Sequence, residues 1–435
     1  MRSPRLLVLI AASLICAMNG ASAGPHDSLN GKLVVGFQGW FKCPTDGGSE
    51  HKWLHWFTKN MADGAHLHLD VAPDTTELTP AEQCPTSLAT RRGGVFNVYS
   101  DENPKTVLRQ FEWMREYGID VAAQQRFLVA IDPKSKPLDV RQGWDQVLDN
   151  SLHAADATGR GLYVMYDIAG ADPKTWADVL VTDWQNLLAS GITGRPSYQR
   201  HKGKPVLAIA GIGLGGRPGT PEEALALVSR LREVSAPYGG LTLIGAGPAG
   251  WRTGTRDVKG GREWDPVYRA FDIINPWTVG RYRDAASFEA FLKENIEPDL
   301  AETKRLGIDY MPVIYPGTSQ QNLFASAGRR PADRQAQLYN MVPRDCGRFL
   351  WMQAARDRQA GATMLYAAMF DEVDEGTALF KLAQPEDDPQ GVQMLSIDAD
   401  GCKLPSDWYL RVSGEIAKML KRHEPPSATL PISPP

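Results

Sequence analysis

Short apolar runs alternate with longer amphipathic segments along most of the chain. Runs rich in Val, Ile and Leu are typical of buried strands, and apolar residues spaced three or four positions apart are typical of helices. On this pattern we expect strands at 33–38, 119–127, 162–168, 205–210, 241–245, 271–275, 310–315 and 363–370. We expect helices at 104–117, 140–158, 173–189, 221–234, 265–270, 285–306, 347–360 and 408–420.

Strands that alternate with helices indicate parallel βαβ units. Eight such strands are the number that closes a (β/α)₈ TIM barrel, so the fold class we predict is α/β, as a single barrel domain over residues 24–424. An open doubly wound sheet is the alternative. The segment 42–94 is rich in Gly, Pro, Asp, Thr and His, and it predicts a long loop after the first strand. Loops of this length in compact domains are commonly functional.

Polar and aromatic residues gather where the predicted strands end. Active sites of (β/α)₈ barrels lie at the carboxyl ends of the strands, so these residues are candidates for substrate binding. The candidates are Gln38, Trp40, Gln125, Arg126, Tyr166, Asp167, Trp277, Tyr315 and Asp371. Tryptophans at this edge either pack in the core or offer an indole face to the C–H face of a sugar ring. The tryptophans in question are Trp40, Trp53, Trp56 and Trp277.

The last predicted strand runs into four carboxylates within five positions: Asp371, Glu372, Asp374 and Glu375. Acids this close raise one another's pKa values unless they are partnered. A pair of carboxyls serving as acid and base of a glycoside hydrolase is one interpretation, with Glu372 and Glu375 as the pair. A metal-dependent hydrolase using all four acids is a second interpretation. A solvated acidic turn without chemistry is a third.

The composition and charge of the chain limit which ligands and macromolecules it is expected to bind. The 435 residues are 43% hydrophobic and 23% charged, which is ordinary for a globular protein, and the net charge of −4 leaves no basic footprint for nucleic acid. The glycine-rich segment 211–216 lacks the spacing of a dinucleotide loop, so it predicts a tight turn. The cysteine spacings match no zinc pattern. A zinc site at the histidines before residue 70 stays possible, but no His-x-x-x-His helix supports it, and we expect these histidines to hydrogen-bond substrate or solvent. We therefore expect no cofactor and no metal, and we expect a monomer.

The first residues predict export. Arg2 and Arg5 precede an apolar run, and Ala21-Ser22-Ala23 is a small-residue cleavage site, so residues 1–23 read as a signal peptide of a secreted or periplasmic protein. No later stretch is long and apolar enough to span a membrane. The Pro- and Ser-rich segment 425–435 predicts a disordered tail.

Four cysteines remain after cleavage: Cys43, Cys84, Cys346 and Cys402. An even number in an exported chain permits disulfides with three connectivities. Cys43 and Cys84 lie in the same long loop region, so we expect these two to pair.

The segment 368–378, Ala-Met-Phe-Asp-Glu-Val-Asp-Glu-Gly-Thr-Ala, resembles the strand-eight motif of the glycoside hydrolase family 99 and family 71-like group, which includes endo-α-mannosidases. In those enzymes the motif reads Asn-Glu-Trp-His-Glu-Gly-Thr, and its glutamates fall on Glu372 and Glu375. Further stretches resemble a bacterial branch labelled xylosidase/arabinosidase. They are 35–41, 73–77, 113–120, 124–127, 315–319 and 406–410.

The resemblance implies a retaining hydrolase on a (β/α)₈ barrel that needs no metal or cofactor. In that mechanism the first glutamate acts as base on the sugar's own 2-hydroxyl and a 1,2-anhydro sugar forms, so Glu372 corresponds to the base. The second protonates the leaving oxygen, so Glu375 corresponds to the acid/base. This chain has Val373-Asp374 where the endomannosidases have Trp-His, and Asp371 where they have Asn. The mannoside contacts of those side chains therefore do not transfer.

The sequence thus predicts an exported glycoside hydrolase that acts on a polysaccharide or glycan. A non-catalytic carbohydrate-binding protein on the same scaffold is the alternative from another functional class. Turnover of any glycan separates these two, and activity in the presence of EDTA separates the hydrolase from a metal-dependent one.

Overall fold

The computed structural model describes residues 26–48, 50–329, 336–422 and 425–434, so the predicted signal peptide lies outside the described residues. The described strands are β1 (Leu33–Phe37), β2 (Cys84–Ala89), β3 (Val95–Val98), β4 (Val121–Phe127), β5 (Gly161–Asp167), β6 (Arg200–His201), β7 (Lys204–Ala210), β8 (Thr242–Ala246), β9 (Ile273–Ile274), β10 (Asp309–Tyr310), β11 (Val313–Ile314) and β12 (Leu365–Ala367). Every expected strand position contains a described strand, whereas β2, β3 and β6 were not expected from the apolar runs.

The main sheet is mostly parallel and curls back on itself. Its strand order is β10-β9-β8-β7-β5-β4-β1-β12-β11, and β6 pairs antiparallel with β7. The two strands at the ends of this order, β10 and β11, are halves of one stretch separated only by Met311 and Pro312. The first half pairs with β9 and the second with β12. The fold is therefore (β/α)₈ barrel-like, and an open doubly wound sheet does not fit it.

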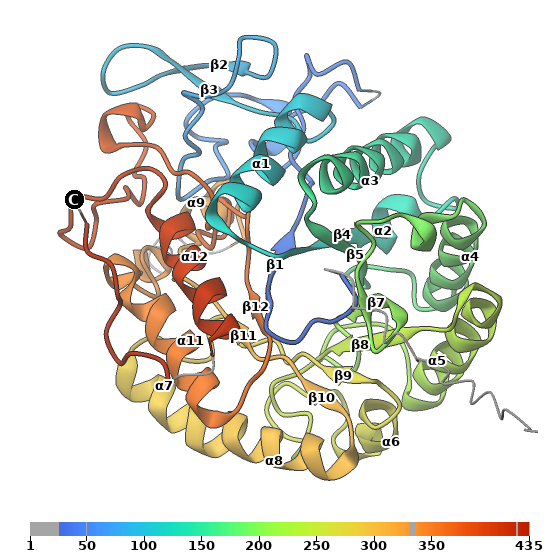
Figure 1. Ribbon diagram of the computed structural model, residues 1–435. Coiled ribbons are helices and arrows are strands. Elements are labelled where there is room, and N and C mark those ends of the chain that lie inside the picture. Colours follow the sequence, from blue (N-terminus) through green and yellow to red (C-terminus); the bar gives the residue numbers. More distant parts are fainter. Residues whose placement is uncertain (1–25, 49, 330–335, 423–424, 435) are drawn as a thin grey trace, which may run out of the picture.

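Helices surround the curled sheet (Figure 1). The described helices are α1 (Pro104–Tyr117), α2 (Leu128–Ile131), α3 (Leu138–Thr158), α4 (Trp176–Ala189), α5 (Pro221–Ser235), α6 (Asp265–Tyr268), α7 (Ala285–Phe291), α8 (Glu297–Leu306), α9 (Gln321–Ser326), α11 (Arg348–Ala360) and α12 (Trp408–Lys421). The single helix expected at 285–306 is divided by a π-helical turn, η5 (Leu292–Ile296).

Helix boundaries follow the capping signals in the sequence. At α1 the Asn103 side chain accepts a hydrogen bond from Lys105 N, Pro104 occupies the first turn, and Gly118 ends the helix in the left-handed conformation. At α5, Thr220 and Glu223 form a capping box. These local signals explain why the expected helix limits and the observed ones nearly coincide.

The long first loop is an ordered subregion beside the barrel. It carries the antiparallel hairpin β2–β3, which lies outside the ring of helices (Figure 1). Cys43 and Cys84 form the predicted disulfide, with their Cα atoms 6.3 Å apart. Trp56 is fully buried, and its indole N–H donates to the carbonyl of Tyr99 at 2.8 Å. A second disulfide joins Cys346 to Cys402.

We expect that replacing Cys43 and Cys84 together by Ser lowers the free energy of unfolding by about 4 kcal/mol, because a disulfide across this separation restricts the unfolded chain by about that amount. The separation is 41 positions. Urea unfolding under oxidising conditions measures the effect. The Cys346→Ser/Cys402→Ser pair, which closes a loop of 56 positions, is the matched control and should lose a similar amount. An unchanged midpoint for the first pair would contradict the prediction.

The end of the chain packs against the domain. Residues 425–434, for which the sequence predicts disorder, contain no helix or strand, yet the Trp351 indole N–H donates to the Ser427 carbonyl at 3.1 Å. Leu430 and Ile432 pack against the hydrophobic core. Within the described ranges no helix has the length and apolar character needed to cross a bilayer. The two disulfides fit an extracellular protein.

Candidate active site

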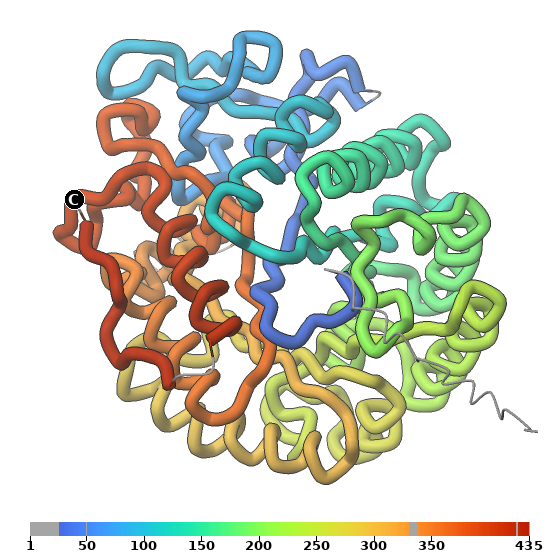
Figure 2. Tube along the Cα trace, viewed as in Figure 1, coloured from blue at the N-terminus to red at the C-terminus, as the bar shows by residue number. Residues whose placement is uncertain are grey.

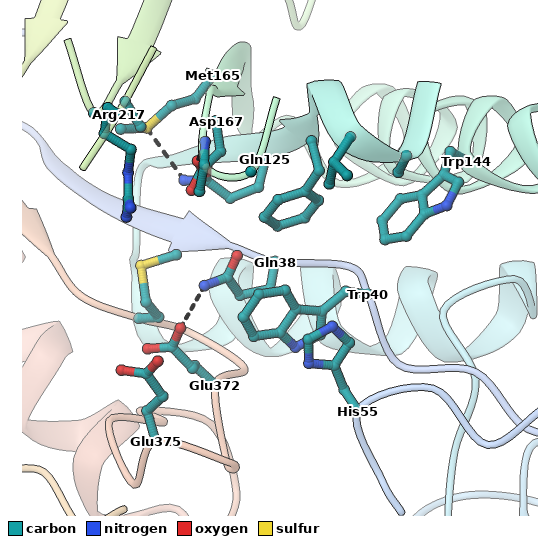
Figure 3. A pocket seen from close by; sticks show the side chains of 18 of the residues that line it. Gln38, Trp40, His55, Gln125, Trp144, Met165, Asp167, Arg217, Glu372 and Glu375 are labelled. Carbon is teal, nitrogen blue, oxygen red and sulfur yellow. Dashed lines mark hydrogen bonds between the residues drawn. The ribbon is translucent and has the colours of Figure 1, made fainter. Parts of the chain in front are cut away.

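A cavity of about 810 Å³ opens at the carboxyl ends of the parallel strands. Seven of the residues expected at this edge line it: Gln38, Trp40, Gln125, Asp167, Trp277, Glu372 and Glu375. They come from the ends of β1, β4 and β5 and from the segments after β9 and β12. Figure 3 shows both glutamates directed into the same space as Gln38, across from Gln125 and Asp167.

Glu372 is buried and held by two donors. Gln38 Nε2 donates to Oε1 at 2.5 Å, and the Thr377 hydroxyl donates to Oε2 at 2.5 Å. Burial raises the pKa of Glu372 well above its usual value, and the neighbouring charges of Glu375 and Asp374 raise it further. The two donated hydrogen bonds act in the opposite direction because they favour the ionised carboxylate.

Glu375 is half-buried and has a different set of contacts. Gln320 Nε2 donates to its Oε2 at 2.8 Å. Its backbone carbonyl accepts from Ser319 N at 3.1 Å and from the Thr318 hydroxyl at 2.8 Å, so the loop after β11 fixes the residue. Burial, together with the charge of Asp374, raises the pKa of Glu375 to about 7. This carboxyl can therefore exchange a proton near neutral pH.

Asp371 was expected to bind substrate, and the structure corrects this. Its side chain is fully buried and lies outside the cavity lining. It accepts hydrogen bonds from Gln38 N at 2.8 Å and Gly39 N at 2.9 Å, so it holds the end of β1 against the acidic turn. Burial raises its pKa to about 7, and these two backbone donors oppose the shift.

Asp374 connects the acidic turn to the long first loop. His55 Nδ1 donates to Asp374 Oδ2 at 3.0 Å across 319 positions of sequence. The His55 ring stacks on Trp40, with ring centroids 3.8 Å apart and an interplanar angle of 6°. His55 also lines the cavity, so the loop supplies a wall of the site.

The aromatic residues divide between cavity wall and core. Trp40 stacks on His55 and on Phe127, with the Trp40 and Phe127 ring centroids 5.3 Å apart, so its indole is already packed against two other rings. Trp277 and Trp144 also line the cavity. Of the four candidate tryptophans, Trp277 is the one that we still expect to offer an indole face to a sugar ring. Trp56 belongs to the core, and Trp53 packs on Phe57 outside the cavity lining.

Arg126 and Tyr166 were also expected in the site and lie on the other side of the sheet. Arg126 donates to both carboxylate oxygens of Asp183 at 2.6 Å and to Asp145 at 2.7 Å, between α3 and α4. The Tyr166 hydroxyl donates to Asp183 at 2.5 Å. Successive side chains of a strand point to opposite faces. Because Gln125 and its neighbours in register face the cavity, Arg126 and Tyr166 face the helices.

Tyr315 is a further correction. It is fully buried, its hydroxyl donates to the backbone carbonyl of Tyr282, and its ring packs on Tyr282 and Phe349. It therefore supports the region after β11 and does not line the cavity.

Several cavity residues were not among the predicted site residues. They are His55, Phe127, Trp144, Met165 and Arg217. Phe127 and Met165 share the inward face of their strands with Gln125 and Asp167, so alternation places them in the lining once Gln125 is known to face inward. His55 and Arg217 lie on loops, where spacing carries no such signal. Across the described residues, no group of three or more His, Cys, Asp or Glu side chains is arranged to hold a metal ion.

Comparisons with known proteins agree with this fold. The chain matches no protein-family model and no curated protein sequence. Among solved structures it resembles a GH99 endo-alpha-mannosidase from Bacteroides thetaiotaomicron, with a TM-score of 0.61 and 13% identity over 91% of this chain and 98% of that chain. A glycoside hydrolase-like protein matches with a TM-score of 0.53 and 12% identity over 90% and 94% of the two chains. At these identities the likeness shows the fold, which is one used by glycoside hydrolases.

Proposed function

We propose that this protein is an exported glycoside hydrolase that cleaves a polysaccharide or glycan with retention of configuration. The observation that carries the proposal is the pair Glu372 and Glu375, which line one cavity at the end of β12 and whose carboxyl pKa values are both raised. Raised pKa values in a cleft are typical of catalytic carboxyls. The resemblance of the acidic turn to the family 99 motif supports the same pair.

The mechanism that fits this pair passes through the sugar's own 2-oxygen. Glu372 takes the proton of the 2-hydroxyl, and the 2-oxygen forms a bond to C1 while the bond from C1 to the leaving oxygen breaks. Glu375 gives its proton to that oxygen. Water then attacks C1 while the bond from C1 to the 2-oxygen breaks, Glu375 takes a proton from the water, and the 2-oxygen recovers its proton from Glu372. Inversion at C1 occurs twice, so configuration is retained.

Hydrogen bonding supports this division of roles. Both oxygens of Glu372 accept from donors, which suits a carboxylate base. Glu375 has one donor, on Oε2, in the described structure, which leaves its other oxygen for the proton of an acid. Burial raises the pKa values of both groups, and for Glu372 this opposes its role as base. The charge of Glu375 raises the pKa of Glu372, so substrate contact with the 2-hydroxyl bears on which carboxyl holds the proton.

The experiment that tests the proposal is incubation of the mature chain with a panel of plant, yeast and bacterial polysaccharides. We expect release of reducing sugar from at least one of them, unchanged by EDTA, with NMR showing that the first anomer released has the substrate's configuration. Loss of activity with EDTA would favour the metal-dependent hydrolase. Binding of glycans without any turnover would favour the carbohydrate-binding protein, an alternative that the substitution of Trp-His by Val373-Asp374 keeps open.

A further inference from the structure

Arg217 is a charged side chain that enters the cavity and that the proposed mechanism does not use. It lines the cavity together with Asp167, and its guanidinium points into the space between Asp167 and the glutamates (Figure 3). Its Nε is buried and has no hydrogen-bond partner. Among the described residues, no carboxylate lies within ion-pair distance of this guanidinium. Burying part of a charged guanidinium without a hydrogen-bond acceptor costs free energy, and a bound acceptor would offset that cost.

The loop after β7 holds Arg217 in this position. Lys259 Nζ donates to the Arg217 carbonyl at 3.0 Å and to the Gly219 carbonyl at 2.8 Å. At Gly211 the backbone has φ of 93°, and a Cβ there would lie 3.3 Å from Cγ and Cδ of the Arg217 side chain. Gly211 thus leaves the stem of Arg217 room to pass towards the cavity.

The acids around Arg217 are already engaged. Asp167 accepts a hydrogen bond from Ala169 N at 2.6 Å, which holds its carboxyl on the loop that follows β5. Burial raises the pKa of Asp167, and the charge of Arg217 opposes that shift. Glu50, another carboxyl of the cavity lining, pairs with Lys42 at 2.9 Å. Asp167 thus feels the charge of Arg217 without forming an ion pair with it, and a planar carboxylate or a sulfate can still bind the guanidinium through two parallel hydrogen bonds.

We propose that the substrate is an anionic glycan, and that Arg217 binds a carboxylate or sulfate substituent on one of its sugar units. This inference rests on the proposed glycoside hydrolase function and names the substrate class of the same site. Asp167 and Gln125, which line the cavity beside Arg217, would contact hydroxyls of that sugar unit.

Calorimetric binding tests the inference, in the Glu375→Gln background so that no substrate is consumed. One arm compares oligogalacturonate and oligoglucuronate with their methyl esters. A second arm compares a κ-carrageenan oligosaccharide with its desulfated form. We expect the acidic member of at least one pair to bind about tenfold tighter or more. The arm that shows the preference tells a uronate from a sulfate ester.

Arg217→Met should abolish the preference, and Arg217→Lys, which keeps the charge but not the planar fork, should reduce it. Arg283→Met removes an equal charge from an exposed position away from the cavity lining and should keep the preference intact. Equal binding of acidic and neutral members, or a preference that survives in Arg217→Met, would overturn the anionic subsite alone. Absence of binding by every sugar in both arms would contradict the carbohydrate function as well.

Discussion

Replacement of Glu375 by Gln is expected to lower kcat on an unactivated glycan by about 10²- to 10⁴-fold, the usual contribution of a general acid. A glycan leaves as an alkoxide unless its oxygen is protonated, and Gln cannot supply the proton. An aryl glycoside with a good leaving group, such as a dinitrophenyl sugar, needs little protonation and should keep far more of its turnover. Rates on the two substrate types give the measurement.

Two further variants make this result specific. Glu372→Gln removes the base and should reduce turnover of both substrates. Glu386→Gln changes an exposed glutamate that pairs with Arg92 and should leave both rates near the wild type. If Glu372→Gln shows the dependence on leaving group and Glu375→Gln does not, the two roles are exchanged. If both variants keep nearly full activity on a natural glycan, the acidic turn is not catalytic.

The second large effect concerns stability. We expect Glu375→Gln to be more stable than the wild type at pH 8 by up to about 3 kcal/mol, since a pKa difference of one unit corresponds to about 1.4 kcal/mol. The native pKa of Glu375 is about 7, whereas the model value is 4.5. Between these values the native state binds more protons than the unfolded state. The contribution of Glu375 to stability is thus fully present below pH 4.5 and is lost as the pH rises through 7.

The measurement is chemical unfolding of the wild type and Glu375→Gln at pH 4.5, 6 and 8. The difference between the two proteins should be small at pH 4.5 and grow towards pH 8, and this difference removes the contributions of other titrating groups. Glu386→Gln again serves as the control and should show no such growth. A Glu375→Gln variant that is no more stable than the wild type at pH 8 would show that ionised Glu375 is well solvated or paired.

Periodicity and capping signals were enough to predict the strands of the barrel, its long helices and the edge of the sheet at which the cavity opens. What they did not predict is which residue of each strand end faces inward. Gln125 and Arg126 were both proposed for the site, yet neighbours on a strand face opposite sides, and only Gln125 lines the cavity. The alternation was present in the sequence, but it could not be anchored until one inward residue was known.

Contacts across long loops were beyond sequence reasoning. His55 reaches Asp374 because the first loop folds over the strand ends, and nothing in the local pattern indicates that approach. Arg217 follows a glycine-rich turn that was correctly expected to be a turn, but its direction depends on contacts with Lys259. Tertiary packing determines where these loop side chains lie, so neither residue spacing nor composition predicts their positions.

The closure of the sheet also has a consequence for how the protein reaches its folded state. The strand that carries the acidic turn, β12, pairs with β1 from the start of the chain, and the two lie side by side in Figure 2. Gln38 meets Asp371 across 333 positions, so β1 must wait for a strand that is synthesised several hundred residues later. Until β12 pairs with it, β1 exposes unpaired backbone N–H and C=O groups that can pair with strands of other chains. We expect truncated chains to aggregate without forming a cavity, so nascent fragments would have no activity in the cell that makes them.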